Sequence, residues 1–257
     1  MTPGDLALAG LAALIAGVVN ALAGGGTLIS FPMLLALGVP PISANVTNTV
    51  ALVPGYLGGT LAQRADLTGQ RRRLRVLMPL AAAGGLAGAV LLLLTPERAF
   101  EVLIPVLILA AVAVLALGDA VKRRVAERVS RLGADGAERL AGPAVGIFLA
   151  AIYGGYFGGG LGIIVLAVLG TILVDSLTRL NALKQVSSLV INAVAAAVFV
   201  AFGDVVWSAA AVMLVCAVVG GYLGGTLAGR VSARTLQRIV LVIGVVVAVA
   251  YAVRTYA

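Results

Sequence analysis

The sequence predicts an all-α polytopic membrane protein made of two inverted-topology repeats, each a glycine-broken helical hairpin followed by three transmembrane helices. Three observations predict it. The 257 residues are 61% hydrophobic and only 11% charged, with a mean hydropathy of +1.14, whereas a soluble domain is roughly half apolar. Basic residues gather in a few short segments, and similar motifs recur in the two halves of the chain.

Six apolar runs are long enough to cross a bilayer, because a hydrocarbon core of about 30 Å requires about 20 residues of helix. These runs are 43–63, 74–95, 98–121, 180–202, 208–228 and 234–253. Two further apolar segments, 6–38 and 144–173, are each interrupted by three consecutive glycines. Each is too long for one crossing, so we expect each to form a hairpin with the glycines near its tip.

The basic residues predict the orientation of the chain. Segments 64–75 and 122–143 are rich in arginine, which is typical of cytoplasmic loops. With both segments inside, 6–38 and 144–173 must each cross an even number of times, and both termini lie outside. We therefore divide the chain into a first repeat, a basic cytoplasmic connecting loop and a second repeat, at residues 1–121, 122–143 and 144–257. The net charge of +8 is explained by these loops, so no nucleic-acid partner is expected.

The two halves share several features in the same order. The glycine runs 24–26 and 158–160 correspond, as do Asn45 with Asn181 and Gly84–Gly85 with Gly220–Gly221. Such a spacing indicates an internal duplication. Each half contains one hairpin and three crossings, an odd total, so the halves must be inverted relative to each other. Many secondary transporters have this architecture.

The glycine runs are the first candidate site. Irregular backbone within lipid is tolerated only where it is buried in protein or lines a watery cavity. The arm at 27–38 would be a half-helix of roughly 18 Å, and its free N–H groups and dipole would favour an anion. The alternative is that these glycines only allow close packing, which we expect for the pairs Gly55 and Gly59, Gly84 and Gly88, and Gly220 and Gly224.

Polar residues near the glycine runs complete the candidate site, because polar groups within a membrane are functional candidates by default. Lys184 would either neutralise an anionic substrate or reach the inner surface, and Asn192 would either contact substrate or join helices. Tyr153 and Tyr156 are gating candidates or ordinary hairpin packing. The substrate-binding candidates from the residues alone are Gly24, Gly25, Gly26, Asn45, Asn48, Gly158, Gly159, Gly160, Lys184, Gln185, Ser188 and Asn192.

The chemistry that the sequence lacks narrows the function. It contains no histidine, and no nucleophile and base can be paired, so we expect neither an enzyme nor a metal or cofactor site. No acidic residue lies deep in a span. Coupling to protons would therefore use a protonatable substrate, a rim carboxylate such as Asp175, or Lys184.

Three segments carry a family resemblance: NALAGGGTLISFPMLLALGVPPISANVTNTVA, YGGYFGGGLGIIVLAVLG and LKQVSSLVINAVAAAVFVAFGDVVW. They resemble the TauE/SafE (sulfite exporter) family of bacterial membrane transporters over nearly the whole chain. The resemblance implies transport of sulfite, sulfoacetate or related organosulfonates across the cytoplasmic (inner) membrane, driven by the proton gradient. It also implies a site at the glycine turns and their flanking Asn and Thr residues, which adds Thr27. The second glycine run lacks a proline equivalent to Pro32, so the two hairpins need not behave alike.

The prediction is thus a secondary transporter of small sulfur-containing anions that works by alternating access. Two alternatives remain open at this point: an anion channel, which would need a continuous wet path, and a membrane scaffold or assembly factor with no transport. The expected partners are a small anionic substrate and the lipid bilayer, and a homodimer is left open.

Overall fold

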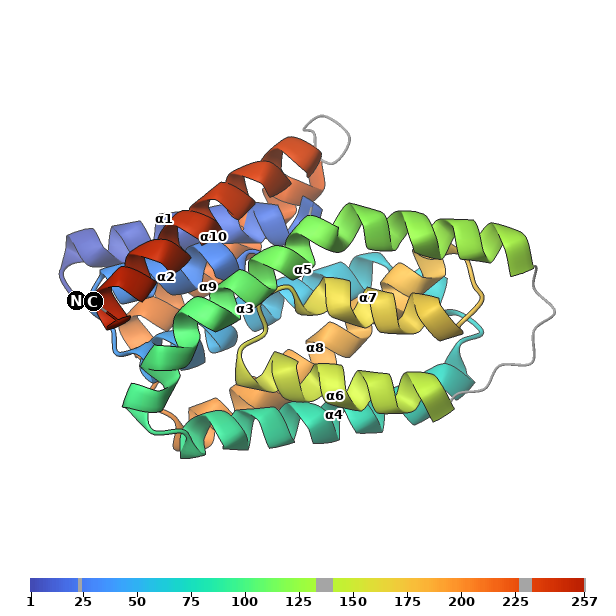
Figure 1. Ribbon diagram of the computed structural model, residues 1–257, viewed down its shortest axis with the longest axis horizontal. Helices are drawn as coiled ribbons and strands as arrows, with labels where there is room; N and C mark the ends of the chain where they lie inside the picture. The colour runs from blue at the N-terminus through green and yellow to red at the C-terminus, as the bar shows by residue number, and fades with distance from the viewer. Residues whose placement is uncertain (23–24, 133–140, 227–232, 257) are drawn as a thin grey trace.

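The structure of the protein is a computed structural model that describes residues 1–22, 25–132, 141–226 and 233–256. The described residues form helices joined by short connections and contain no strand, which confirms the all-α polytopic fold class (Figure 1). The helices are α1 (Pro3–Leu22), α2 (Thr27–Ala36), α3 (Pro41–Ala62), the short 3-10 helix η1 (Arg64–Leu67), α4 (Arg71–Leu94), α5 (Glu97–Leu132), α6 (Ala141–Tyr156), α7 (Leu161–Ile172), α8 (Leu177–Phe202), α9 (Trp207–Thr226) and α10 (Ala233–Tyr256).

Five helices are long and apolar enough to cross a membrane. They are found within α1, α4, α5, α8 and α9. The helix α3 spans 22 residues but carries a polar cluster in its first half. Many large apolar side chains, such as Leu94, Val106 and Val246, are exposed on the outside of the bundle, and an apolar surface of this extent marks a membrane-embedded protein.

Both glycine-broken segments are hairpins. The N- and C-termini lie at one end of the molecule, and η1, the start of α4 and the end of α5 lie at the other (Figure 1). We call these the termini end and the basic end. The α1–α2 hairpin starts and finishes at the termini end, whereas the α6–α7 hairpin starts and finishes at the basic end. This is the path that the distribution of arginines predicts.

The structure differs from the predicted element lengths in two places. The first arm of the first hairpin, α1, is not among the six predicted spans, yet it has 20 residues and is long enough to cross. The second arm, α2 with 10 residues, is the half-helix predicted at 27–38. Residues 122–132, predicted as loop, continue α5. The reason is a packing contact: Val125 of this extension is buried and lies against Gly170 of α7.

Two helix pairs pack closely through glycines, α1 with α9 and α4 with α6. A Cβ added to Gly220 would lie 2.0 Å from the Leu14 carbonyl oxygen, and one added to Gly88 would lie 2.1 Å from the Ile152 carbonyl oxygen. Only glycine allows the backbones to come so near. The close-packing interpretation is therefore confirmed for Gly84, Gly88 and Gly220. It is wrong for Gly55, because a Cβ added there would meet no atom within 4 Å.

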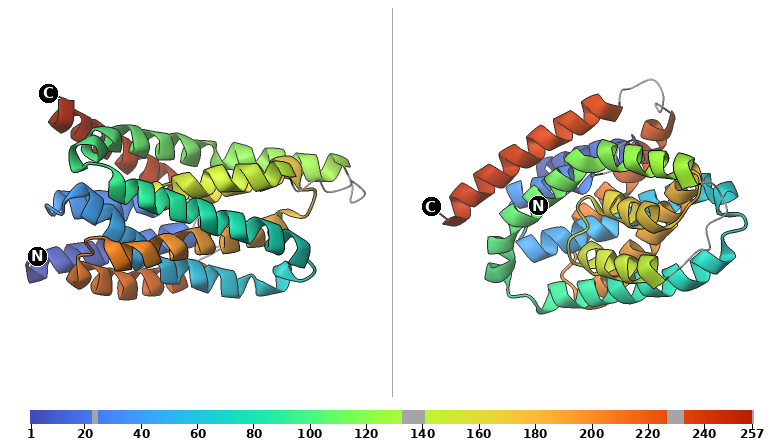
Figure 2. Two further views of the ribbon diagram at one scale, coloured as in Figure 1. Left: turned by 90° about the horizontal axis from the view of Figure 1, so that it is seen from below. Right: turned by 45° about the vertical axis from the view of Figure 1, so that its right-hand side comes forward.

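The helix contacts of the two halves correspond to each other. The pair α1–α9 matches α6–α4, α3–α9 matches α8–α4, α2–α10 matches α7–α5, and α2–α3 matches α7–α8. The central pairs α3–α8 and α5–α10 each join one helix to its own counterpart in the other half. Figure 2 shows the α5–α10 pair crossing one face of the bundle. Each hairpin thus packs mainly against helices of the other half.

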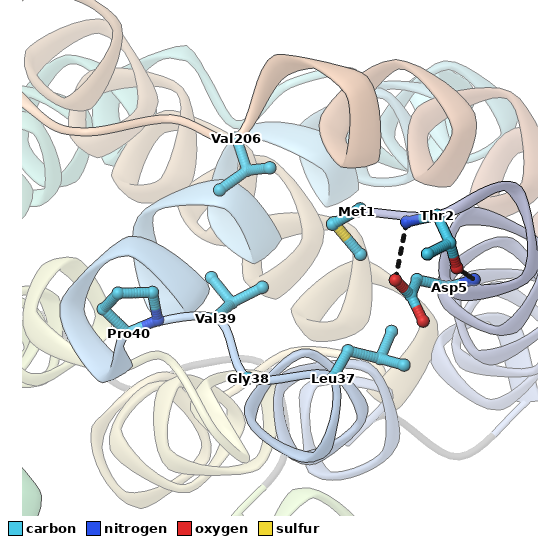
Figure 3. A pocket seen from close by; sticks show the side chains of 8 residues that line it. All are labelled: Met1, Thr2, Asp5, Leu37, Gly38, Val39, Pro40 and Val206. Carbon is cyan, nitrogen blue, oxygen red and sulfur yellow. Dashed lines mark hydrogen bonds between the residues drawn. The ribbon is translucent and has the colours of Figure 1, made fainter.

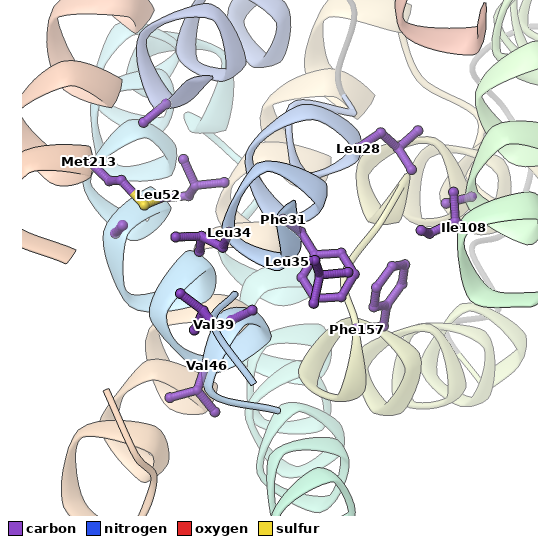
Figure 4. Close-up of a cluster of buried hydrophobic side chains, with 14 of the residues drawn as sticks. Leu28, Phe31, Leu34, Leu35, Val39, Val46, Leu52, Ile108, Phe157 and Met213 are labelled. Atoms are coloured by element: carbon purple, nitrogen blue, oxygen red, sulfur yellow. The ribbon is translucent and has the colours of Figure 1, made fainter. Parts of the chain in front are cut away.

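The half-helix α2 lies in the centre of the hydrophobic core. Seven of its ten residues are buried, and Figure 4 shows Leu28, Phe31 and Leu34 surrounded by side chains from several other helices. The Phe31 ring meets Phe157, which directly precedes the second glycine run, edge to face at 5.4 Å between centroids. The two hairpins are therefore in direct contact.

Candidate functional site

Both glycine breaks lie against the same turn of α5. A Cβ on Gly25 would be 3.2 Å from the Leu115 side chain, and one on Gly159 would be 2.9 Å from Ala111 Cβ. A Cβ on Gly160 would be 3.2 Å from Val114. The tips of two hairpins that enter from opposite ends of the molecule thus converge within five residues of one helix.

The first break positions the start of α2 beside α1. Gly25 has φ +92°, a left-handed conformation that favours glycine. The Gly26 N–H donates to the Asn20 Oδ1 at 2.8 Å, and a Cβ on Gly26 would lie 2.4 Å from the Ala16 carbonyl oxygen. The next residue, Thr27, is buried in the first turn of α2. Gly24 lies outside the described residues.

The second break contains two left-handed glycines, Gly158 with φ +77° and Gly160 with φ +71°. Gly160 caps α7 and has no side chain to occupy the free N–H groups of the first turn. The carbonyl oxygens of Gly158 and Gly160 accept from Leu161 N–H and Ile163 N–H. No described residue accepts a hydrogen bond from the Gly162 N–H between them.

Polar residues of α3 connect it to both hairpins. Ser30 Oγ of α2 donates to Asn48 Oδ1 at 2.5 Å. Asn45 Nδ2 donates to the Tyr156 carbonyl oxygen at 2.8 Å, next to the second glycine run. This bond leaves Asn45 Oδ1 buried without a partner, and an unpaired buried acceptor is costly. Asn45 therefore offers an acceptor to water or to a ligand.

The polar residues of α8 face the second break and α3. Asn192 Nδ2 donates to the Ser188 carbonyl oxygen at 2.8 Å, and its Oδ1 lies 3.9 Å from where a Cβ of Gly158 would be. Ser188 Oγ is buried without a partner. The carboxamide of Gln185 fills the space above Gly59 of α3, so it helps to join the two central helices.

Lys184 reaches the start of α7. The space beside Gly162 is occupied by the Lys184 side chain, with its Cδ and Cε 3.6 and 3.9 Å from where a Cβ would be. The side chain is half-buried. It therefore lies over the first turn of a helix whose N–H groups are incompletely paired, and it does not extend away from the bundle.

Both gating candidates have packing partners. Tyr153 OH donates to the Gly159 carbonyl oxygen at 2.6 Å, so this tyrosine holds the second glycine turn in place. Tyr156 packs its ring on Phe100 with centroids 5.8 Å apart, and its hydroxyl lies 3.4 Å from Thr95 Oγ1. Tyr153 thus contacts the proposed site, whereas the Tyr156 side chain lies toward the termini end of α4.

An ionic cluster joins the halves at the basic end. Asp175, between α7 and α8, accepts hydrogen bonds from Arg73 of α4 and from Arg179, whose Nε is 2.9 Å from the carboxylate. Arg73 also donates to Gln70 at 2.8 Å. Burial raises the pKa of Asp175, but the hydrogen bonds from Arg179 and Arg73 outweigh it and hold this pKa below its usual range.

This cluster predicts a pH-dependent stability. A lowered pKa means that the carboxylate stabilises the fold above the ordinary value of about 3.9, and that this contribution is lost as the pH falls through the folded pKa. We expect Asp175→Asn to destabilise the protein by about 1–3 kcal/mol at pH 7. The melting temperature of this variant should also fall less than that of wild type as the pH is lowered from 6 to 3. Asp66→Asn, at the same end, should behave as wild type; a wild-type pH profile for Asp175→Asn would contradict the prediction.

A surface recess lies at the termini end, away from the glycine breaks. It is bounded by the start of α1, the α2–α3 connection and the start of α9 (Figure 3). Thr2 N donates to Asp5 Oδ2 at 2.7 Å along its edge. Its lining residues are Met1, Thr2, Asp5, Leu37, Gly38, Val39, Pro40 and Val206, none of which belongs to the predicted site.

Sequence reasoning missed two residues at the breaks. Asn20 fixes the start of α2 through Gly26, and Gln237 of α10 donates to the Leu115 carbonyl oxygen on the turn of α5 that both breaks contact. Asn20 was detectable as a polar residue one turn before a glycine run. Gln237 had no such signal, because its role depends on the packing of α10 against α5.

Comparison with known proteins identifies the family. The family model described as sulfite exporter TauE/SafE matches residues 9–251. The chain belongs to the TauE/SafE family. This confirms the resemblance seen in the glycine-rich segments, and the chain is thus a membrane transporter of the TauE/SafE family rather than an enzyme.

Curated relatives of this TauE/SafE chain carry transporter names. A "Probable membrane transporter protein" of Haemophilus influenzae is 29% identical over 213 residues, covering 81% of this chain and 79% of the relative. The "Probable membrane transporter protein YfcA" of Escherichia coli is 25% identical over 205 residues, covering 79% and 73%. No solved structure matches the chain.

Proposed function

We propose that the protein is a secondary transporter of small sulfur-containing anions, such as sulfite, sulfoacetate or related organosulfonates, across the cytoplasmic membrane. The observation that carries the proposal is the convergence of two glycine breaks, from opposite ends of the molecule, on residues 111–115 of α5. Two hairpin tips that meet inside the bundle can form one site that is reached alternately from either side.

The proposed architecture is a pair of inverted repeats with both termini outside. The interchangeable helix contacts of the two halves support it, as does the position of the two termini at the end opposite the arginine clusters. Alternating access would then move each hairpin with the helices it packs on. The Asp175 cluster at the basic end and the hydrogen bond from Ser43 Oγ to Asp204 Oδ2 at 3.1 Å, at the termini end, are the contacts that would open in turn.

The proposed anion site lies at the first turn of α7. Helix N-termini favour anions through free N–H groups and the helix dipole, and Lys184 adds a full positive charge there. Two buried polar atoms without partners, Asn45 Oδ1 of α3 and Ser188 Oγ of α8, would offer further polar contacts. At the first break, Asn20 already occupies the Gly26 N–H, which makes α7 the stronger of the two helix ends.

Proton coupling is proposed to involve Lys184 or the substrate itself. Asp175 is a poor carrier, because two arginines keep its pKa low and it therefore stays ionised near neutral pH. Uptake into proteoliposomes with an imposed pH gradient tests this directly. A saturable flux that follows the gradient supports a coupled transporter, whereas an electrogenic flux that ignores the gradient indicates a channel.

The decisive test of the site is ligand-induced stabilisation of the purified protein in detergent. A ligand at about 100 times its dissociation constant stabilises the fold by about 2.7 kcal/mol. We expect a selective rise in melting temperature with sulfite or sulfoacetate over sulfate, phosphate and chloride at matched ionic strength. Equal shifts for all of these anions would contradict the proposed substrate class.

Lys184→Ala should abolish most of this ligand-induced shift while leaving the melting temperature without ligand within a few degrees of wild type. The reason is that the substitution removes the charge over α7 but no buried core side chain. Arg71→Ala, an exposed basic residue at the same end, is the control and should keep the full shift. An unchanged shift in Lys184→Ala would remove this lysine from the site.

A further inference from the structure

A second lysine faces the same helix end from the other side. Gly118 and Val125 of α5 both contact α7: a Cβ on Gly118 would be 3.0 Å from Ile163 Cδ1, and Val125 Cγ2 lies 2.1 Å from where a Cβ of Gly170 would be. Lys122 lies between them at helical spacing, four residues after Gly118 and three before Val125. Residues so spaced share one helix face, so Lys122 is on the face of α5 that packs against α7.

The direction of the Lys122 side chain brings its charge toward Lys184. Side chains on a helix tilt toward its N-terminus, which for α5 is the termini end, and the first turn of α7 lies in that direction (Figure 1). Lys184 reaches Gly162 from α8. The Lys122 side chain is thus directed along α5 toward the end of α7 that the Lys184 side chain covers. Repulsion between two half-buried cations is unfavourable unless an anion lies between them.

Neither lysine has a counter-ion in the part of the chain that the structure describes. Lys122 and Lys184 make no hydrogen bond or ion pair with a described residue, and both are half-buried. This contrasts with Arg73 and Arg179 at the same end, which share Asp175. The Gly162 N–H, beneath the Lys184 side chain, also lacks an acceptor among the described residues.

We infer that Lys122 and Lys184, with the first turn of α7, form a dibasic site that selects anions of charge −2 over anions of charge −1. The inference rests on the proposed function and deepens it, since it specifies the charge of the substrate. Its preferred ligands are sulfite as the dianion, or a sulfonate that carries a second acidic group. A sulfonate with a single negative charge would leave one ammonium group uncompensated and would bind more weakly.

The test compares two anions of similar size and different charge. Sulfoacetate carries a sulfonate and a carboxylate, whereas isethionate carries a neutral hydroxymethyl group in place of the carboxylate. Binding of each to the full-length protein in detergent is measured by calorimetry at pH 8 and fixed ionic strength. We expect the wild-type dissociation constant for sulfoacetate to be at least about tenfold lower than that for isethionate, because each uncompensated charge is desolvated.

Lys122→Gln should remove this preference. We expect the dissociation constant for sulfoacetate to rise at least about tenfold and that for isethionate to change much less. Lys122→Arg should restore the preference, and Lys122→Met is a second neutral variant should the glutamine variant not fold. Arg123→Gln is the matched control, because it removes the same charge from the adjacent exposed position. It should bind both anions as wild type does.

The outcomes distinguish the dibasic site from the proposed transport function on which it rests. A wild-type protein that binds both anions equally, or a Lys122→Gln variant with an unchanged ratio, overturns the dibasic site and leaves the sulfonate transporter standing. Equal losses in Lys122→Gln and Arg123→Gln overturn it as well, since they indicate a general surface-charge effect. Binding of neither sulfonate nor sulfite by the wild type overturns both proposals.

Discussion

Replacing Gly220 with alanine is expected to separate α1 from α9 and to destabilise the protein strongly. The added Cβ would lie 2.0 Å from the Leu14 carbonyl oxygen and 2.8 Å from its carbonyl carbon. Because these are backbone atoms in a helix, no side-chain rotation relieves the overlap. Overpacking of this kind costs about 1–3 kcal/mol and sometimes more, so we expect the largest loss of melting temperature among single glycine-to-alanine changes in α9.

The adjacent residue is a matched control for this prediction. A Cβ on Gly221 would meet no atom within 4 Å, so Gly221→Ala makes the same chemical change one residue further along the same helix. Because alanine has a higher helix propensity than glycine, by about 1 kcal/mol, this variant should be as stable as wild type or slightly more stable. Equal melting temperatures for the two variants in detergent would show that α1 and α9 are not packed as closely as the structure indicates.

The main features of the fold could be predicted because they depend on local signals. Apolar length located the helices, and the arginine clusters around 64–75 and 122–143 required both glycine-broken segments to be hairpins. The same signals placed Lys122 in a loop, because a run of basic residues normally ends a span. What extends α5 past this point is the contact of Val125 with Gly170 of α7, and a contact between segments 45 residues apart has no signature in the sequence near Lys122.

The candidate site was only partly predictable for the same reason. The glycine runs and the polar residues Asn45, Lys184 and Asn192 stand out against an apolar background. The sequence gives no sign that both runs contact α5 at Ala111–Leu115, because this stretch of α5 is an uninterrupted apolar sequence. Its function in the site comes from what packs on it, which is a property of the tertiary structure alone.

Gly26→Ala is expected to weaken ligand binding at the hairpin tips strongly. The new Cβ would lie 2.4 Å from the Ala16 carbonyl oxygen and 2.9 Å from Asn20 Cγ, so the start of α2 would have to move away from α1. This would break the Gly26–Asn20 hydrogen bond and shift Phe31 against Phe157, which transmits the displacement to the second glycine turn. Because displacements of about 1 Å can change function about 100-fold, we expect at least a tenfold rise in the sulfoacetate dissociation constant.

Two further variants separate this displacement from simpler effects. Asn20→Ala removes the hydrogen bond to Gly26 but leaves the close approach to Ala16 possible, so it should lower the melting temperature, by an amount equivalent to about 1–3 kcal/mol, and weaken binding less than Gly26→Ala does. Gly55→Ala on α3 adds a methyl group where no atom lies within 4 Å, and it should bind sulfoacetate as wild type does. If Gly26→Ala folds and binds sulfoacetate with wild-type affinity, the position of α2 does not control the site, and ligand recognition must then depend on α7 and its lysines alone.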